Sequence, residues 1–168
     1  EAMRTETKAL VHRAFFENDD NSFATLLTSR EAYVNGALSK LYGVEGPEDD
    51  ESFEWVTLDA DERSGLLTRA AFLTVYASSK FESPIKRGAW LYREALGGAL
   101  GDPPPNVDDS PPGGGGALTV REDVEVRTAG ADCSGCHAII NPLGFTLGHY
   151  DAIGRFQAED MGTDKPID

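Results

Sequence analysis

The stretch Cys133-Ser134-Gly135-Cys136-His137 holds both cysteines of the 168-residue chain and places a histidine directly after the second one. This spacing is the attachment signature of a c-type haem. On a helical turn, residues three apart share one face, so both thiols can reach the two vinyl groups on one porphyrin edge. The histidine that follows is then directed at the iron. We therefore expect one covalent haem c, bound through Cys133 and Cys136, with His137 as the proximal iron ligand.

The residues around the motif predict a short helix over residues 132–140. Asp132 can cap its first turn. The pair Asn141-Pro142 predicts its end, because the residue before a proline avoids the α region. We expect the Nδ1–H group of His137 to donate to a backbone carbonyl of the loop that follows.

Three other interpretations of the cysteine pair remain open. A disulfide between Cys133 and Cys136 leaves His137 unexplained. A zinc site needs four ligands, but the chain has only His12, His137 and His149 and no second CxxC pair. A thioredoxin-like redox pair belongs in a βαβ setting, which the neighbouring sequence does not indicate.

The second face of the iron decides what a haem at this site does. A cytochrome that only transfers electrons usually holds its iron between two protein ligands. Met161 is the leading candidate for the distal ligand, because it lies in a polar stretch after the motif, where a loop can fold over the haem edge. Met3, His12 and His149 are alternatives, as is iron with no second protein ligand. Candidate donors to the haem propionates are Arg87, Arg121 and Arg155.

Apolar residues at helical spacing predict a mainly α fold, a small helical c-type haem domain with long irregular loops. We expect a helical body over residues 1–100. A Pro/Gly-rich linker follows over residues 101–117, because its composition cannot bury an apolar face. The haem-attachment segment, residues 118–168, is expected to pack on the helical body.

Polar caps mark several helix starts. Ser22 and Ser83 each precede a helical pattern, and Thr119 begins a capping box with the glutamate three residues later. We also expect a helix over residues 30–42, capped by Ser29, and an extended segment over residues 53–58.

Composition restricts the partners. The formal net charge of −14 argues against nucleic acid or an anionic membrane, and favours a redox partner with a basic docking face. No apolar stretch approaches the ~20 residues of a membrane span. Because the first residue is Glu1 and not methionine, we expect a segment of a larger protein.

Short motifs recur in order along the chain: residues 21–28, 33–35, 41–43, 63–68, 83–88, a Pro-Pro-Pro loop, CxxCH, 141–145 and 150–155. As a set they resemble two adjacent domains of unknown function that occur in large exported bacterial proteins, beside other haem-binding cytochrome c-like domains. The resemblance covers nearly the whole chain. It departs from the relatives at Arg127, where a histidine is common, and at Gly148 and Asn141, where an acid is common.

The resemblance to c-type cytochromes implies maturation outside the cytoplasm, and hence a periplasmic or otherwise exported bacterial protein. We expect an electron-transfer domain of a larger protein. Two alternatives remain: a five-coordinate haem for small-ligand binding or peroxide chemistry, and an interaction domain stapled by a structural haem. The sequence shows no hydrolase or nucleotide-binding motif, so we expect no catalytic residues and favour an electron-transfer module over an enzyme.

Overall fold

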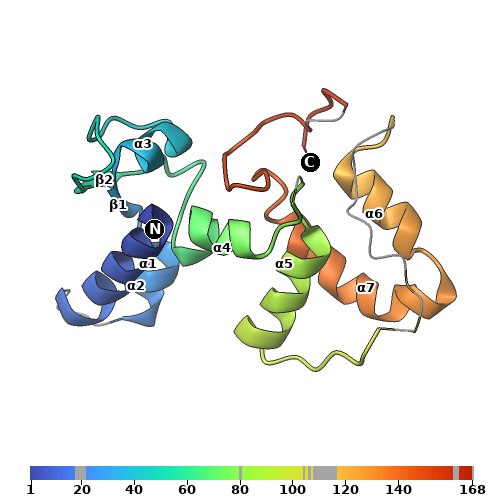
Figure 1. Cartoon of the computed structure of the whole chain (residues 1–168). Helices are drawn as coiled ribbons and strands as arrows, with labels where there is room; N and C mark the ends of the chain where they lie inside the picture. Colours follow the sequence, from blue (N-terminus) through green and yellow to red (C-terminus); the bar gives the residue numbers. More distant parts are fainter. Residues whose placement is uncertain are drawn as a thin grey trace. The chain divides into compact units, whose positions relative to one another are not determined.

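The structure, a computed structural model, describes residues 1–17, 22–79, 81–103, 105, 107, 117–160 and 163–167. Over these residues the chain is mainly helical, as expected, and also contains an antiparallel two-stranded sheet (Figure 1). No helix in these ranges combines the length and the apolar character that a membrane span needs.

The elements follow one another in two groups. The first group consists of α1 (Ala2–His12), the π-helical turn η1 (Arg13–Glu17), α2 (Phe23–Thr28), β1 (Glu31–Val34), α3 (Gly36–Tyr42), β2 (Glu54–Thr57), the 3-10 turn η2 (Leu66–Thr68) and α4 (Ala70–Val75). The second group consists of α5 (Pro84–Trp90), the π-helical turn η3 (Leu91–Ala95), α6 (Val120–Thr128) and α7 (Ala131–Phe145).

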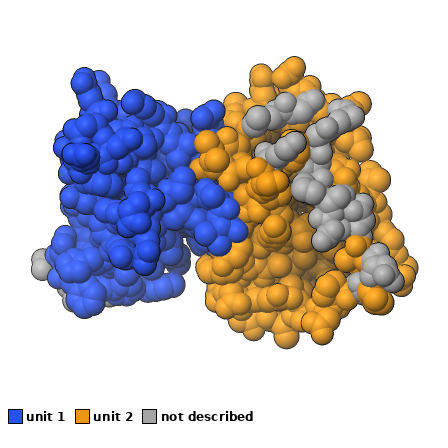
Figure 2. Space-filling view, in the orientation of Figure 1, with its two compact units in different colours: residues 1–75, 154–156 blue, residues 76–153, 157–168 orange. Residues whose placement is uncertain are grey.

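The chain divides into two compact units (Figure 2). Unit 1 comprises residues 1–75 and 154–156, and unit 2 comprises residues 76–153 and 157–168. The division falls after α4, whereas the sequence predicts a body that extends to residue 100. The reason is that α5 packs closely against α7, the helix of the CxxCH motif. Most of the predicted linker lies outside the described residues, so the linker stays a prediction.

The sheet of unit 1 pairs β1 with β2 in antiparallel register, with Glu31 opposite Thr57 and Val34 opposite Glu54. The strand β2 confirms the extended segment predicted over residues 53–58. Alternate residues of β1 are buried, which is the burial pattern of a strand with one face on a core. That core consists of Ala32, Val34, Leu38, Tyr42, Leu58 and Ala70.

The helix expected over residues 30–42 is wrong in its first half. Residues 31–34 form β1, and α3 begins only after Asn35, whose side-chain oxygen accepts from the Leu38 N–H at 3.1 Å. Pairing with β2 draws residues 31–34 into a strand, and the expected cap Ser29 instead accepts from the Glu31 N–H at 3.2 Å, at the end of α2. The end is as expected, because Gly43 closes α3 in the left-handed conformation, with φ of 69°.

Two predicted caps in unit 2 are confirmed. The Ser83 hydroxyl accepts from the Lys86 N–H at the start of α5, at 3.4 Å. Thr119 and Glu122 form the capping box of α6, with each side chain accepting from the other's backbone N–H at 3.1 and 2.8 Å.

The helix α7 starts earlier than predicted. Its N-cap is Gly130, whose carbonyl oxygen accepts from the N–H groups of Cys133 and Ser134 at 2.9 and 2.8 Å. Asp132 lies in the first turn and not at the cap. An acidic residue in the first turn still favours the helix through the dipole of the helix N-terminus.

The helix α7 also ends later than residue 140, because it continues through Pro142 to Phe145. A proline inside a helix removes one backbone hydrogen bond. Ile140 and Gly144, which flank Pro142 in the helix, pack closely against α5, and this packing offsets the loss. A Cβ atom on Gly88 of α5 would overlap the Ile140 carbonyl oxygen, and one on Gly144 would overlap the backbone of α5. Tertiary contact therefore overrides the local preference of the residue before proline.

Candidate functional site

The helix α7 brings the three predicted haem residues onto one face. Cys133, Cys136 and His137 stand at positions i, i+3 and i+4, which are neighbours on a helix surface. Both cysteines carry free thiols, Cys133 half-buried and Cys136 exposed, and His137 is half-buried. The same face continues into Ile140 and Gly144, which are buried against α5. The face is thus covered at its C-terminal half and partly exposed at the CxxCH half.

The imidazole of His137 is held from behind by Asn141, one turn later on the same helix. Its Nδ1 lies 2.8 Å from the Asn141 side-chain oxygen. That oxygen can only accept, so in the neutral imidazole the proton stands on Nδ1 and Nε2 is the nitrogen left with a lone pair. The expectation of a backbone carbonyl as the acceptor is therefore wrong. An amide oxygen takes its place, because α7 continues past residue 140.

Asn141 is itself buried, and its amide nitrogen donates to the Thr128 hydroxyl oxygen at 2.8 Å. The Thr128 hydroxyl in turn donates to the Val124 carbonyl oxygen at 2.8 Å, within α6. The sequence reasoning missed both supporting residues. The spacing of four between His137 and Asn141 was the available signal, and it becomes informative only when the helix extends beyond Pro142.

This donor set fits a c-type haem. The two thiols lie on one helical face, and the imidazole on that face presents an unprotonated Nε2 held in place by a hydrogen bond, as is usual for metal-binding histidines. Among the residues that the structure describes, no three His, Cys, Asp or Glu side chains gather as a metal site. The zinc interpretation therefore lacks its four ligands there.

The candidates for the distal ligand lie in different places. Met3 packs against the unit 1 core, with its sulfur 3.9 Å from the Thr74 hydroxyl. His12 places Nδ1 3.0 Å from a carboxylate oxygen of Glu17. The Nδ1 of His149, in unit 2, lies 3.0 Å from the Gln157 carbonyl oxygen. Met161 lies outside the described residues, so its role stays a prediction.

Arg87 holds the segment that follows α7. Its side chain is fully buried and donates to the carbonyl oxygens of Leu147, Tyr150 and Asp151 at 2.9, 2.8 and 2.9 Å. Burial lowers the pKa of Arg87 to about 10, so the guanidinium stays charged at neutral pH. Arg87 therefore bonds backbone carbonyls inside unit 2, and its buried place does not suit the propionate role considered from the sequence.

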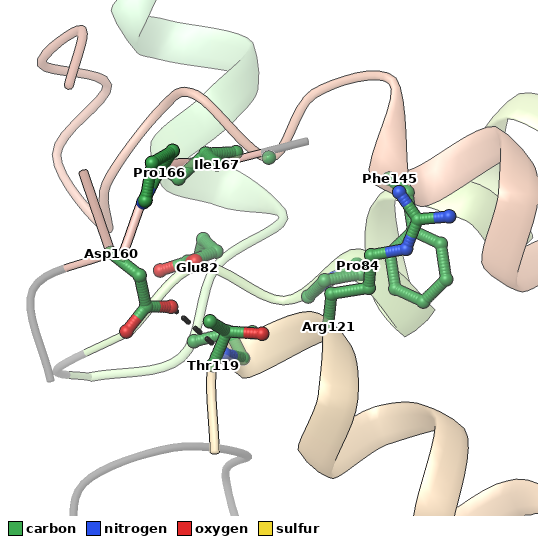
Figure 3. A pocket seen from close by; sticks show the side chains of 10 residues that line it. Glu82, Pro84, Thr119, Arg121, Phe145, Asp160, Pro166 and Ile167 are labelled. Atoms are coloured by element: carbon green, nitrogen blue, oxygen red, sulfur yellow. Dashed lines mark hydrogen bonds between the residues drawn. The ribbon is translucent and has the colours of Figure 1, made fainter. Parts of the chain in front are cut away.

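A small pocket lies at the start of α6 in unit 2 (Figure 3). Asp160 closes one side of it, where a carboxylate oxygen accepts from the Val120 N–H at 2.8 Å. On another side, the Arg121 guanidinium stands 4.9 Å from the centre of the Phe145 ring. The volume of about 20 Å³ is close to that of one water molecule and far too small for a porphyrin. The pocket is best understood as the capped end of a helix.

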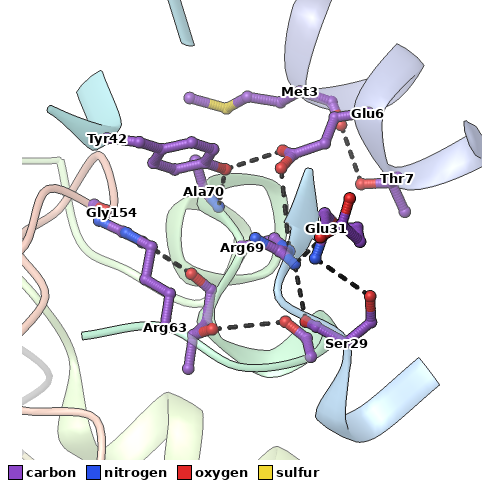
Figure 4. A network of polar contacts seen from close by, with 12 residues as sticks. Met3, Glu6, Thr7, Ser29, Glu31, Tyr42, Arg63, Arg69, Ala70 and Gly154 are labelled. Carbon is purple, nitrogen blue, oxygen red and sulfur yellow. Dashed lines mark hydrogen bonds and ion pairs between the residues drawn. The ribbon is translucent and has the colours of Figure 1, made fainter. Parts of the chain in front are cut away.

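A buried polar cluster occupies unit 1 (Figure 4). The Tyr42 hydroxyl donates to Glu6 at 2.8 Å and accepts from the Ala70 N–H at 3.0 Å. The Arg69 Nε lies 3.9 Å from the other Glu6 oxygen, and the side chains of both residues are fully buried. Burial raises the pKa of Glu6 to about 6, against the opposing effect of Arg69. The cluster thus places ionisable groups in the interior of unit 1, where desolvation opposes the charged form of Glu6.

The two arginines of this cluster bond the backbone. Arg69 donates to the carbonyl oxygens of Ser29 and Glu31 at 2.9 and 3.0 Å. Arg63 donates to those of Thr68 and Gly154 at 2.7 and 2.6 Å. These bonds tie segments distant in sequence into unit 1, which indicates a structural role for the cluster.

Fold and site together define a mainly helical protein that carries a CxxCH motif on an open helix face. The chain belongs to a family described as proteins of unknown function, DUF1588, whose model matches residues 63–160. A second family of the same description, DUF1592, matches residues 1–44. The predicted pair of domains of unknown function is thereby confirmed. No curated protein and no solved structure shows significant similarity to the chain.

Proposed function

We propose that the chain is an electron-transfer domain with one covalently bound haem c, part of a larger exported bacterial protein. The observation that carries this proposal is the shared, open face of α7, with two free thiols beside an imidazole whose Nε2 is left to bind iron. Covalent haem accounts for all three residues at once, whereas a disulfide accounts only for the cysteines.

Each residue of the motif has a separate task. The thiols of Cys133 and Cys136 each add across one vinyl group, with the sulfur bonding one vinyl carbon and the thiol proton going to the other. His137 binds the iron through Nε2 while its Nδ1–H group stays bonded to Asn141. The bound iron supplies a reversible one-electron change.

Charge and composition support the rest of the proposal. The net charge of −14 favours a redox partner with a basic docking face over an acidic one. Electron transfer also calls for a second iron ligand, for which Met161 is the sequence candidate. Five-coordinate iron without that ligand would instead bind small molecules, and a purely structural haem would serve an interaction domain.

An optical spectrum tests the proposal. The full chain is produced with an export signal in cells that mature c-type cytochromes, and spectra are recorded in both redox states with and without carbon monoxide. We expect covalent haem bands that are low-spin and unaffected by carbon monoxide. The Cys136→Ser variant should lose one of its two thioether links and load poorly, while Ser134→Ala, an exposed neighbour on α7, should load like the wild type.

Other results point elsewhere. High-spin iron that binds carbon monoxide readily would favour the five-coordinate alternative over electron transfer. A chain without haem bands, produced beside a fully loaded control cytochrome, would overturn haem binding itself.

A further inference from the structure

The support behind His137 is a chain of three hydrogen bonds with a single direction. His137 donates to Asn141, Asn141 donates to Thr128, and Thr128 donates to the Val124 carbonyl oxygen, each over 2.8 Å. Asn141 and Thr128 are buried, at 7% and 8% exposure, so water has little access to compete for these bonds. A polar chain in such surroundings must be satisfied at every step, because a buried polar group without a hydrogen-bond partner is strongly unfavourable.

Thr128 fixes the direction of this chain. A hydroxyl has one proton, and Thr128 gives it to the carbonyl one turn back in α6, as threonines in helices commonly do. Its oxygen can then only accept from Asn141. The amide must therefore turn its nitrogen to Thr128 and its oxygen to His137.

The opposite direction would block the site. With the amide reversed, its nitrogen would donate to Nδ1 of His137, and the imidazole proton would move to Nε2. A protonated Nε2 has no lone pair for a metal. The tautomer of His137 is thus decided two hydrogen bonds away, by Thr128 in α6.

We propose that Asn141 and Thr128 are positioning residues that select the iron-binding tautomer of His137 and set the reduction potential of the haem. This inference rests on the proposed haem function. The strength of the bond at Nδ1 controls how electron-rich the imidazole is, since a better acceptor raises the basicity of a ligating histidine. A more basic ligand stabilises the oxidised iron and lowers the potential.

Four variants of the haem-loaded full chain test the potential. Asn141→Asp supplies a charged acceptor, and we expect a potential lower by at least about 59 mV, which is a tenfold change for one electron. Thr128→Val keeps the shape but removes the hydroxyl, so Asn141 loses its anchor and we expect a higher potential. Thr128→Ser keeps the hydroxyl and should match the wild type. The matched control Thr146→Val removes an exposed hydroxyl that bonds only the Leu143 carbonyl oxygen in the structure, and should also leave the potential unchanged.

A second measurement needs no haem. Nitrogen-15 NMR of the histidine rings in the haem-free full chain reports which nitrogen of His137 carries the proton. We expect the Nδ1–H tautomer in the wild type and in Thr128→Ser, and a gain of the Nε2–H tautomer in Thr128→Val.

The two readouts separate the possible failures. Loaded haem with the same potential in Asn141→Asp, Thr128→Val and the wild type would overturn the positioning role while leaving the haem function intact. A chain that takes up no haem yet shows the Nδ1–H tautomer, dependent on Thr128, would retain the hydrogen-bond chain and overturn the haem function. A purely structural role would lower the stability of the variants without moving the potential in opposite directions.

Discussion

At the scale of single residues, Glu6 is a buried titratable group whose surroundings shift its pKa into the range of folding experiments. Its carboxyl group is fully buried and faces Tyr42, Arg69 and Arg63. Desolvation favours the neutral acid, while the two arginines and the tyrosine hydroxyl favour the charged form. Desolvation prevails, and the pKa rises from 4.5 to about 6.

This shift predicts a pH dependence of folding. Because the native state binds the proton more tightly than the unfolded chain, the stabilisation is complete below pH 4.5 and is lost as the pH rises through about 6. The shift corresponds to about 2 kcal/mol. We expect Glu6→Gln to remove this contribution, so that its free energy of unfolding in urea falls less steeply than that of the wild type across this range.

The matched control is Glu54→Gln, at an exposed position of strand β2. It should keep the wild-type slope. An unchanged slope in Glu6→Gln would show that the buried carboxyl group does not take up a proton in this range.

The shared helix face of Cys133, Cys136 and His137 could be predicted from the sequence, because local spacing alone defines it. The side-chain oxygen that accepts the hydrogen bond from His137 could not be predicted in this way. Asn141 reaches it only because the helix continues through Pro142, and that continuation depends on a neighbouring helix. Thr128 lies in the preceding helix, α6, and no local sequence pattern connects it with the CxxCH motif.

At the scale of elements, the contact between α5 and α7 holds the CxxCH helix in place. Gly88 of α5 sits against the Ile140 carbonyl oxygen, and Gly144 of α7 sits against the backbone of Pro84. Neither position has room for a methyl group. The helices therefore approach so closely that backbone meets backbone.

This contact predicts the effect of adding one carbon. We expect Gly88→Ala or Gly144→Ala to lower the free energy of unfolding by about 1–3 kcal/mol, the usual cost of overpacking. Gly135→Ala is the control, because a Cβ atom there meets nothing within 4 Å. Its stability should equal or slightly exceed that of the wild type, since alanine favours a helix. Equal stability of all three variants in chemical denaturation would contradict the close contact.

Three of the five predicted helix caps are confirmed, whereas the starts of α3 and α7 were predicted wrongly. Ser22, Ser83 and Thr119 cap α2, α5 and α6 as expected, because a cap is a bond between near neighbours. Residues 30–42 were predicted as one helix, but pairing with β2 draws the first of them into a strand. The end of α7 was predicted too early for the same kind of reason, a contact distant in sequence.

At the scale of the whole molecule, the helical spacing of apolar residues predicted a mainly helical chain, and the order of short motifs predicted a pair of domains of unknown function. Both are confirmed. The boundary between compact units was not predictable from composition, because the Pro/Gly-rich stretch is conspicuous in sequence while the packing of α5 on α7 is not. The structure instead groups α5 and α6 around α7, the CxxCH helix, in unit 2.

The central claim is that haem is bound covalently at Cys133 and Cys136. The most direct measurement is the intact mass of the denatured full chain, produced with an export signal in cells that mature c-type cytochromes. We predict the mass of the chain plus one haem, and the mass of the bare chain when both cysteines are changed to serine. A bare wild-type chain, isolated from cells that fully load a control cytochrome, would contradict the claim.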